Sequence, residues 1–299
     1  MALQKRLQKL QSLLGRLMAE KDPDIVHDTR VASRRLQQNL TALFPKPRPG
    51  NVRRLRKKLK RIRRLLGEWR NCDVLLDLVT NELLHVKNPA HREAWEIIRS
   101  HLSAERTHHM TLSQSKIEKV SAETCKLLEK LRGNLPETHS RQELSKRVSE
   151  SVQDALGKWK AALSQAETTR NPQDIHTFRI ATKRLRYRVE ALNKIELETQ
   201  ESWLDFLKKL QESLGQWHDR QALYQAISEA VAKPDLLLHE PAAVQYLLQQ
   251  LLNGRETEQK AFEGILSLAR EDESFHVLDT IGETNAPVAR GPANETPES

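Results

Sequence analysis

The sequence predicts an all-α protein made of two antiparallel helical bundles. Apolar residues recur at helical spacing along nearly the whole chain of 299 residues, and no alternating apolar–polar run is long enough for a strand. Glycine and proline are few and fall mostly in short stretches between the periodic segments, which favours antiparallel packing. A pair of motifs also occurs twice in the same order, which indicates a duplicated helical unit.

Helix boundaries are expected where proline, glycine or asparagine interrupts the apolar pattern. The first helix is marked by a leucine at every third or fourth position: Leu3, Leu7, Leu10, Leu14 and Leu17. Later boundaries are expected at Lys21–Pro23, Pro45–Asn51, Pro89, Gly133–Pro136, Asn171–Pro172, Pro234 and Gly254. From about Ile281 the periodicity is lost, so we expect a disordered tail. The expected units are residues 1–135, 136–280 and 281–299.

Two motifs define the repeat. Residues 26–36 read VHDTRVASRRL and residues 175–187 read IHTFRIATKRLRY, with an Asp-Pro or Asn-Pro pair a few positions earlier in each copy. Asp or Asn followed by Pro is typical of a helix start, so both helices should begin at the same point of the repeat. The second motif is LGEWRN at residues 66–71 and LGQWHD at residues 214–219, at almost equal distance from the first motif.

Each copy of the first motif predicts a helix with one apolar and one basic stripe. At 3.6 residues per turn, His27, Arg30 and Arg34 share a face, and Leu36 and Leu40 lie opposite. The second copy repeats this arrangement. Its basic stripe consists of His176, Arg179, Lys183 and Arg186.

A strongly basic helix is predicted between the two motifs of the first half. From residue 53 to residue 64 every position is Arg or Lys except Leu55, Leu59 and Ile62, which belong to its apolar stripe. Like charges four residues apart destabilise a helix by roughly 0.2–0.5 kcal/mol per pair, and several such pairs accumulate here. A bound polyanion would offset that repulsion. The alternative is a solvated outer face.

Composition narrows the classes of partner. The formal net charge of +9 favours a polyanion, which could be nucleic acid, an anionic membrane surface or a phosphate polymer. The sequence contains no run of about 18 apolar residues, so no membrane span is predicted. The N-terminus lacks the apolar core of a signal peptide. Two cysteines without a CxxC pair predict no disulfide framework and fit a cytoplasmic protein.

Motifs for catalysis or cofactor binding are absent from the sequence. There is no GxxxxGK(S/T), GxGxxG, GxSxG or HExxH pattern. His101, His108 and His109 suggest a metal, but no carboxylate or cysteine completes a site. Asp73 and Asp219 are too isolated for a pair of acid–base carboxylates. We therefore expect no enzyme activity, no cofactor and no metal.

The two His-x-x-Arg helices, the basic helix after the first of them and the two Leu-Gly-x-x motifs together resemble the CHAD family, the conserved histidine α-helical domain. The likeness covers about residues 1–275. The resemblance implies two bundles related by pseudo-twofold symmetry, with basic helices around a central groove. It also implies that inorganic polyphosphate binds in this groove and that the protein associates with polyphosphate granules, which makes other granule proteins candidate partners.

By position, the family's polyphosphate ligands fall on the basic stripes and on the helices beside them. The first copy contributes His27, Arg30, Arg34 and Arg35, and the second copy contributes His176, Arg179, Lys183, Arg184 and Arg186. The flanking helices contribute Lys57, Lys60, Arg61, Arg64, Lys208 and Lys209. Three residues depart from the family pattern. Ile180 stands where Lys is frequent, and Asn71 and His218 replace the usual Asp and Arg, which predicts weaker local contacts.

The sequence thus predicts a non-catalytic module that binds polyphosphate, with Arg giving bidentate contacts and Lys giving point charges. An RNA- or DNA-binding protein is the first alternative, although aromatic residues for base stacking make up only 4% of the chain. Nucleic acid is therefore expected only as a weaker competitor. The second alternative is an enzyme that acts on phosphate, which would need carboxylates to hold a metal ion. A scaffold whose charge only aids solubility is the third alternative.

Overall fold

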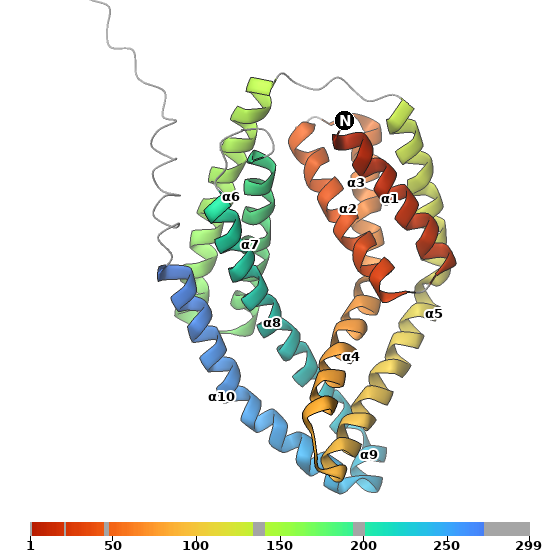
Figure 1. Cartoon of the computed structure of the whole chain (residues 1–299), viewed down its shortest axis with the longest axis vertical. Coiled ribbons are helices and arrows are strands. Elements are labelled where there is room, and N and C mark those ends of the chain that lie inside the picture. Colours follow the sequence, from red (N-terminus) through yellow and green to blue (C-terminus); the bar gives the residue numbers. More distant parts are fainter. Residues whose placement is uncertain (1, 21, 45–47, 134–140, 194–200, 272–299) are drawn as a thin grey trace, which may run out of the picture.

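The protein is all-α in the part of the chain that the structure describes. The computed structural model describes residues 2–20, 22–44, 48–133, 141–193 and 201–271, and within these ranges the chain forms ten helices and no strand (Figure 1). The helices are α1 Ala2–Ala19, α2 Pro23–Leu43, α3 Gly50–Leu65, α4 Gly67–His85, α5 Pro89–Gly133, α6 Arg141–Thr169, α7 Pro172–Leu192, α8 Glu201–Val231, α9 Pro234–His239 and α10 Pro241–Glu271. The predicted tail, 281–299, lies outside the described residues.

The two motif helices begin as the sequence predicts. The side chain of Asp22 accepts a hydrogen bond of 2.8 Å from the backbone N–H of Asp24 at the start of α2. Asn171 caps α7 in the same way, by accepting from the backbone N–H of Asp174 at 2.8 Å. In both helices proline occupies the first turn, where its missing N–H leaves no hydrogen bond unmade.

Three hydrophobic cores hold the helices together. The first core lies among α1, α2, α3 and the later part of α5, and the second lies among α6, α7, the earlier part of α8 and the later part of α10. Figure 1 shows these as two bundles that converge at one end. There α4, the earlier part of α5, the later part of α8 and the earlier part of α10 share a third core. Burial of this core connects the two bundles.

The helix boundary predicted at Gly254 is wrong, because α10 runs through it from Pro241 to Glu271. The physical reason is close packing. A Cβ atom built on Gly254 would lie under 3.0 Å from the ring of Tyr224 on α8. Glycine leaves room here for the end of the Tyr224 ring between α8 and α10, and its helix-breaking tendency is overridden by packing.

A buried ion pair joins α4 to α5. Asp73 is 4% exposed, and its Oδ1 lies 2.5 Å from Nε of Arg106. Removing one member of such a pair leaves an uncompensated charge away from water, which is more costly than never having buried the pair. This carboxylate therefore has a structural partner.

Replacing Gly254 with Ala should destabilise the protein by about 1–3 kcal/mol, because the new methyl group overlaps the Tyr224 ring. The matched control is Gly264→Ala in the same helix, where nothing lies within 4 Å of the added Cβ. That variant should gain about 0.5–1 kcal/mol from helix propensity. Urea unfolding followed by circular dichroism measures both, and equal effects of the two substitutions would contradict the packing explanation.

Replacing Arg106 with Met should destabilise the protein by about 3–5 kcal/mol, because the buried Asp73 carboxylate loses its cation. The control is Lys158→Met, which breaks an ion pair with Asp154 whose side chains are both 65% exposed. Exposed pairs contribute little, so this variant should unfold almost like the parent protein. A small loss for Arg106→Met in thermal unfolding would show that the pair does not stabilise the contact of α4 with α5.

Candidate functional site

The helices that carry the two His-x-x-Arg motifs face each other. Helix α2 of one bundle packs against α7 of the other (Figure 1). Across this contact Nη1 of Arg34 donates a hydrogen bond of 3.2 Å to the hydroxyl of Tyr187. The cationic side chains that influence one another here are called the basic cluster, and they are Arg30, Arg34, Arg63, Arg179 and Lys183.

Neutral oxygen atoms hold two arginines of the first half in place. Arg30 donates from Nη1 to the backbone carbonyl of Arg63 at 2.5 Å. Arg63 in turn donates to Ser33 Oγ at 3.4 Å and to the side-chain oxygen of Gln37. Burial, followed by the nearby charge of Arg34, lowers the pKa of Arg30 and of Arg63 to about 10. These contacts position the two guanidinium groups without neutralising them.

Lys183 carries the ammonium group of the cluster. Burial is the main cause that lowers its pKa from 10.5 to about 7, and the charges of Arg179 and Arg34 lower it further. Asp219 on α8 acts in the opposite direction but does not restore the usual pKa. The side chain is therefore only partly protonated at neutral pH. A bound anion would favour its protonated form.

The two motif histidines have different neighbours. His27 is exposed, and after burial the charge of Arg70 on α4 is the largest cause that lowers its pKa. The ring of His176 is half-buried, and its centre lies 5.4 Å from the ring centre of His218 on α8. Burial and then His218 lower the pKa of His176. His218 Nδ1 lies 3.2 Å from Oδ1 of Asp219.

The remaining predicted residues are more exposed or have other contacts. The guanidinium of Arg186 lies over the ring of Tyr187, 4.8 Å from its centre. Arg61 influences Glu123 of α5, so it lies on the α5 side of α3. Lys208 is exposed and forms an ion pair of 2.7 Å with an acid of its own helix. The other exposed positions are Arg35, Lys57, Lys60, Arg64, Arg184 and Lys209.

Comparison with known protein families identifies the family of this chain. The family profile of the CHAD domain matches residues 1–228 of the chain. The chain belongs to the CHAD family. The resemblance expected from the repeated motifs is thereby confirmed. Curated protein sequences give no significant match.

Two solved structures share the fold of this CHAD chain. The CHAD domain from the plant Ricinus communis superposes with a TM-score of 0.61 at 21% identity, over 88% of each chain. PptA from Streptomyces chartreusis superposes with a TM-score of 0.62 at 18% identity, over 88% of this chain and 95% of that one. At these identities the likeness establishes the fold, while residue roles must come from the geometry of this chain.

Several basic residues at the contact of the CHAD bundles were missed by the sequence reasoning. Arg63 belongs to the cluster, and burial followed by the charges of Arg48 and Arg188 lowers the pKa of Arg56. Arg56 and Arg63 lie seven residues apart, beside the apolar stripe of α3. Residues beside the stripe reach a neighbouring helix, whereas residues opposite it point to solvent, so this spacing could have identified them.

Guanidinium nitrogens at this contact lack acceptors. Among the residues that the structure describes, four Nε atoms here are buried and have no hydrogen-bond partner, those of Arg48, Arg56, Arg179 and Arg186. A buried donor without an acceptor costs free energy, and most are paired in native proteins. These atoms therefore mark the place where an anionic ligand would gain most.

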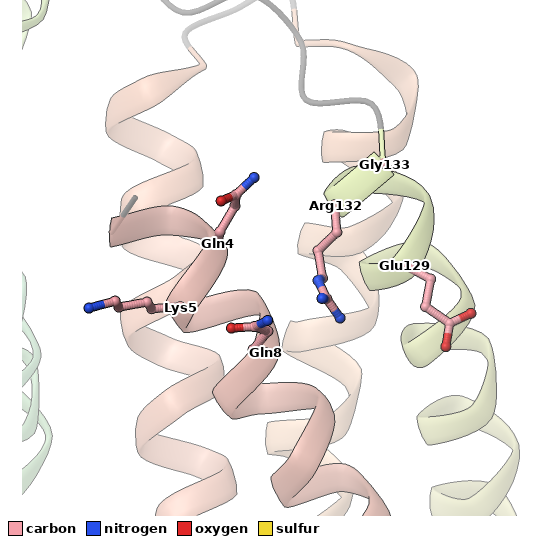
Figure 2. Close-up of a pocket in the computed structure, with 6 residues that line it drawn as sticks. All are labelled: Gln4, Lys5, Gln8, Glu129, Arg132 and Gly133. Atoms are coloured by element: carbon pink, nitrogen blue, oxygen red, sulfur yellow. The ribbon is translucent and has the colours of Figure 1, made fainter.

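Other parts of this CHAD chain offer different chemistry. A hollow of about 570 Å³ lies between α1 and α5. Figure 2 shows the residues that line it, which are Gln4, Lys5, Gln8, Glu129, Arg132 and Gly133. Its charges are mixed, so it lacks the uniform sign of the basic cluster. Within the described ranges no group of three or more His, Cys, Asp or Glu residues could hold a metal ion. No helix in those ranges is both long and apolar enough to cross a membrane.

Replacing Lys183 with Met should stabilise the ligand-free protein by roughly 1–4 kcal/mol at pH 7 and below, because a half-buried charge that Asp219 only partly offsets is removed. Since the pKa of Lys183 is about 7 in the folded protein and its ordinary value is 10.5, the parent protein regains this stability as pH rises from 7 towards 10.5. The gain should therefore shrink over that window. Thermal unfolding across pH measures it, and the exposed Lys209→Met is the control that should show no such trend.

Proposed function

We propose that this CHAD chain binds inorganic polyphosphate, without cleaving it, through the basic cluster and the arginines beside it. The observation that carries the proposal is the set of buried guanidinium nitrogens that have no acceptor among the described residues, at Arg48, Arg56, Arg179 and Arg186. Phosphate oxygens would compensate the positive charge of these guanidinium groups, and a small change of side-chain rotamer would expose the Nε–H groups to them. Because Arg56, Arg179 and Arg186 already sit in packed helices, little conformational entropy would be lost on binding.

A linear phosphate polymer suits the layout of these donors. One group of cations gathers where α2 meets α7. A second group consists of Arg48 before α3, Arg56 on α3 and Arg188 on α7, whose charges act on one another. Lys183 and Arg188 are five residues apart on α7, which corresponds to about 7.5 Å along the helix and about 140° around it, so their side chains leave different sides of α7. We propose that a single flexible chain of phosphates passes around α7 and contacts both groups.

The aromatic residues favour polyphosphate over nucleic acid. Trp69 and Trp217 of the two Leu-Gly-x-x motifs are only 3% and 6% exposed, so neither offers a face on which a base could stack. Tyr187 lies beside the basic cluster, but it is only 9% exposed and its hydroxyl accepts a hydrogen bond from Arg34. RNA or DNA could therefore use only its phosphates here, and nucleic acid is the weaker competitor in this proposal.

The carboxylates favour binding over catalysis. Asp219 is the acid whose charge acts on both Arg179 and Lys183. Enzymes that cleave or transfer phosphoryl groups hold Mg²⁺ or similar ions with carboxylates and bound phosphates. Asp219 and Glu68, whose charge acts on Arg30, belong to no cluster of ligands among the described residues that could hold such an ion. The proposed role is to target or organise polyphosphate in the cytoplasm, where proteins of polyphosphate granules would be its neighbours.

Calorimetric titration with long-chain polyphosphate at about 0.15 M salt tests the proposal. Arg30→Ala combined with Arg179→Ala should weaken binding by tenfold or more, about 1.4 kcal/mol or more in binding free energy, since one member is lost from each half of the cluster. Single-stranded RNA of similar charge should bind more weakly than polyphosphate. The logarithm of the association constant should also fall linearly with the logarithm of the salt concentration.

The matched control is Arg99→Ala combined with Lys158→Ala, which removes the same charge from exposed positions of α5 and α6. This control should bind almost like the parent protein. Equal losses in both double variants would reduce the site to general surface charge, and equal affinity for both polymers would favour the nucleic-acid alternative. Release of phosphate from polyphosphate in the presence of Mg²⁺ or Mn²⁺ would overturn the non-catalytic part of the proposal.

A further inference from the structure

The two halves of the basic surface differ in which of their cations can lose a proton. At equivalent positions of the repeat, the first half has Arg34 and Arg70, and the second half has Lys183 and His218. Arginine stays charged at every physiological pH, whereas histidine titrates near neutrality and a buried lysine can do so. The first half is thus a permanent cation, and the second half has a charge that depends on its surroundings.

The structure places these residues in corresponding contacts. In the first half Arg70 of α4 acts on the motif histidine His27 of α2. In the second half His218 of α8 faces the motif histidine His176 of α7, with 5.4 Å between ring centres. Two facing imidazoles repel each other when both are protonated, and the charge of His218 accordingly contributes to the lowered pKa of His176.

The charged groups around Lys183 come from three helices. Arg179 lies one turn before it on α7, Arg34 and Arg30 face it from α2, and Asp219 faces it from α8. The remaining neighbour, α6, packs on another side of α7, where its Trp159 donates to Thr182 at 2.9 Å. Lys183 therefore stands in a positive environment that one carboxylate only partly offsets.

The pair of histidines has a similar environment. His176 is influenced by His218 of α8 and by Arg179 and Lys183 of its own helix. His218 has Asp219 beside it at 3.2 Å. Each of these groups therefore lies within the field of the same cluster, and an anion bound to the cluster would act on all of them together.

We propose that polyphosphate binding takes up protons at Lys183 and at the His176–His218 pair, so that the affinity of this half of the site decreases as pH rises. This inference rests on the proposed polyphosphate-binding function and adds a pH dependence to it. The first half, with Arg34 and Arg70, binds the polymer at any pH. The second half increases the affinity as pH falls, because its residues become protonated.

The direction follows from the two protonation states. In the free protein the pKa of Lys183 is about 7, and burial holds the pKa of His176 below its ordinary value. A bound polyanion raises both pKa values, since nearby negative charge favours the protonated forms. Between the free and the bound pKa the complex carries more protons than the free protein, so affinity falls with rising pH. Each fully linked proton changes the affinity about tenfold per pH unit.

The experiment is calorimetric titration of the full chain with long-chain polyphosphate, at several pH values between about 6.5 and about 8.5, in pairs of buffers with different ionisation enthalpies. The parent protein should take up protons on binding, and its affinity should fall about tenfold or more across this range. The double variant K183R/H218R carries the residues of the first half. It should take up fewer protons, and its affinity should change much less with pH.

Controls separate this inference from the proposed function. The titratable ends of the polymer are the same for both proteins, so they cancel in the comparison, and K183R and H218R tested singly assign the protons to each position. Tight binding by the parent protein without proton uptake would overturn the inference and leave the proposed function standing. Absence of binding at every pH would overturn both. A pH dependence that persists in a folded K183R/H218R variant would also overturn it.

Discussion

The partial burial of cations with few acids beside them is the constraint on which the rest of this structure depends. Arg30, Arg63, Arg179 and Lys183 all have lowered pKa values, and burial is the first cause for each. That cost must be offset by packing elsewhere in the same helices. Leu36, Leu40, Leu185 and Val189 on the opposite faces of α2 and α7 are at most 1% exposed, and each such side chain contributes about 1.5–3 kcal/mol. The apolar stripes thus keep the basic stripes in place.

Rigid positioning explains why helices are suitable for this purpose. Each cation sits on a helix that is anchored by a hydrophobic core, and the caps at Asp22 and Asn171 fix where α2 and α7 begin. Neutral acceptors such as Ser33 and Gln37 then orient the guanidinium group of Arg63. The protein therefore maintains a positive surface before any partner arrives, and an anion does not need to assemble it.

Local patterns in the sequence were sufficient for the helices and for most of the basic stripes. The capping residues of α2 and α7 and the apolar periodicity determine their limits, and these are short-range properties of the chain. Gly254 shows where such reasoning fails, because a glycine at a close helix contact and a glycine at a helix end look alike in sequence. Arg63 shows the same limit for the site. Its position beside the apolar stripe matters only because α2 packs against that flank, and packing partners are long-range information.

The third core could not be foreseen from periodicity for a similar reason. Helix α5 has 45 residues, about 68 Å at 1.5 Å per residue, so it extends well beyond the bundle in which it ends. Periodicity identifies an apolar face along such a helix, but it does not identify what covers that face. In this protein the later part of α8 and the earlier part of α10 cover it.

The shared third core also has a consequence for how the protein could have originated. A chain that stopped after α5 would expose part of the apolar face formed by Val79 and Ile98, and a chain that began at α6 would do the same to Ile227 and Leu247. Either fragment could bury that face against a second copy of itself, as the protomers of a symmetric dimer do. The covalent link between the halves makes such association independent of concentration. It also allows the two halves to carry different residues at equivalent positions, with arginine in the first half where the second has lysine or histidine.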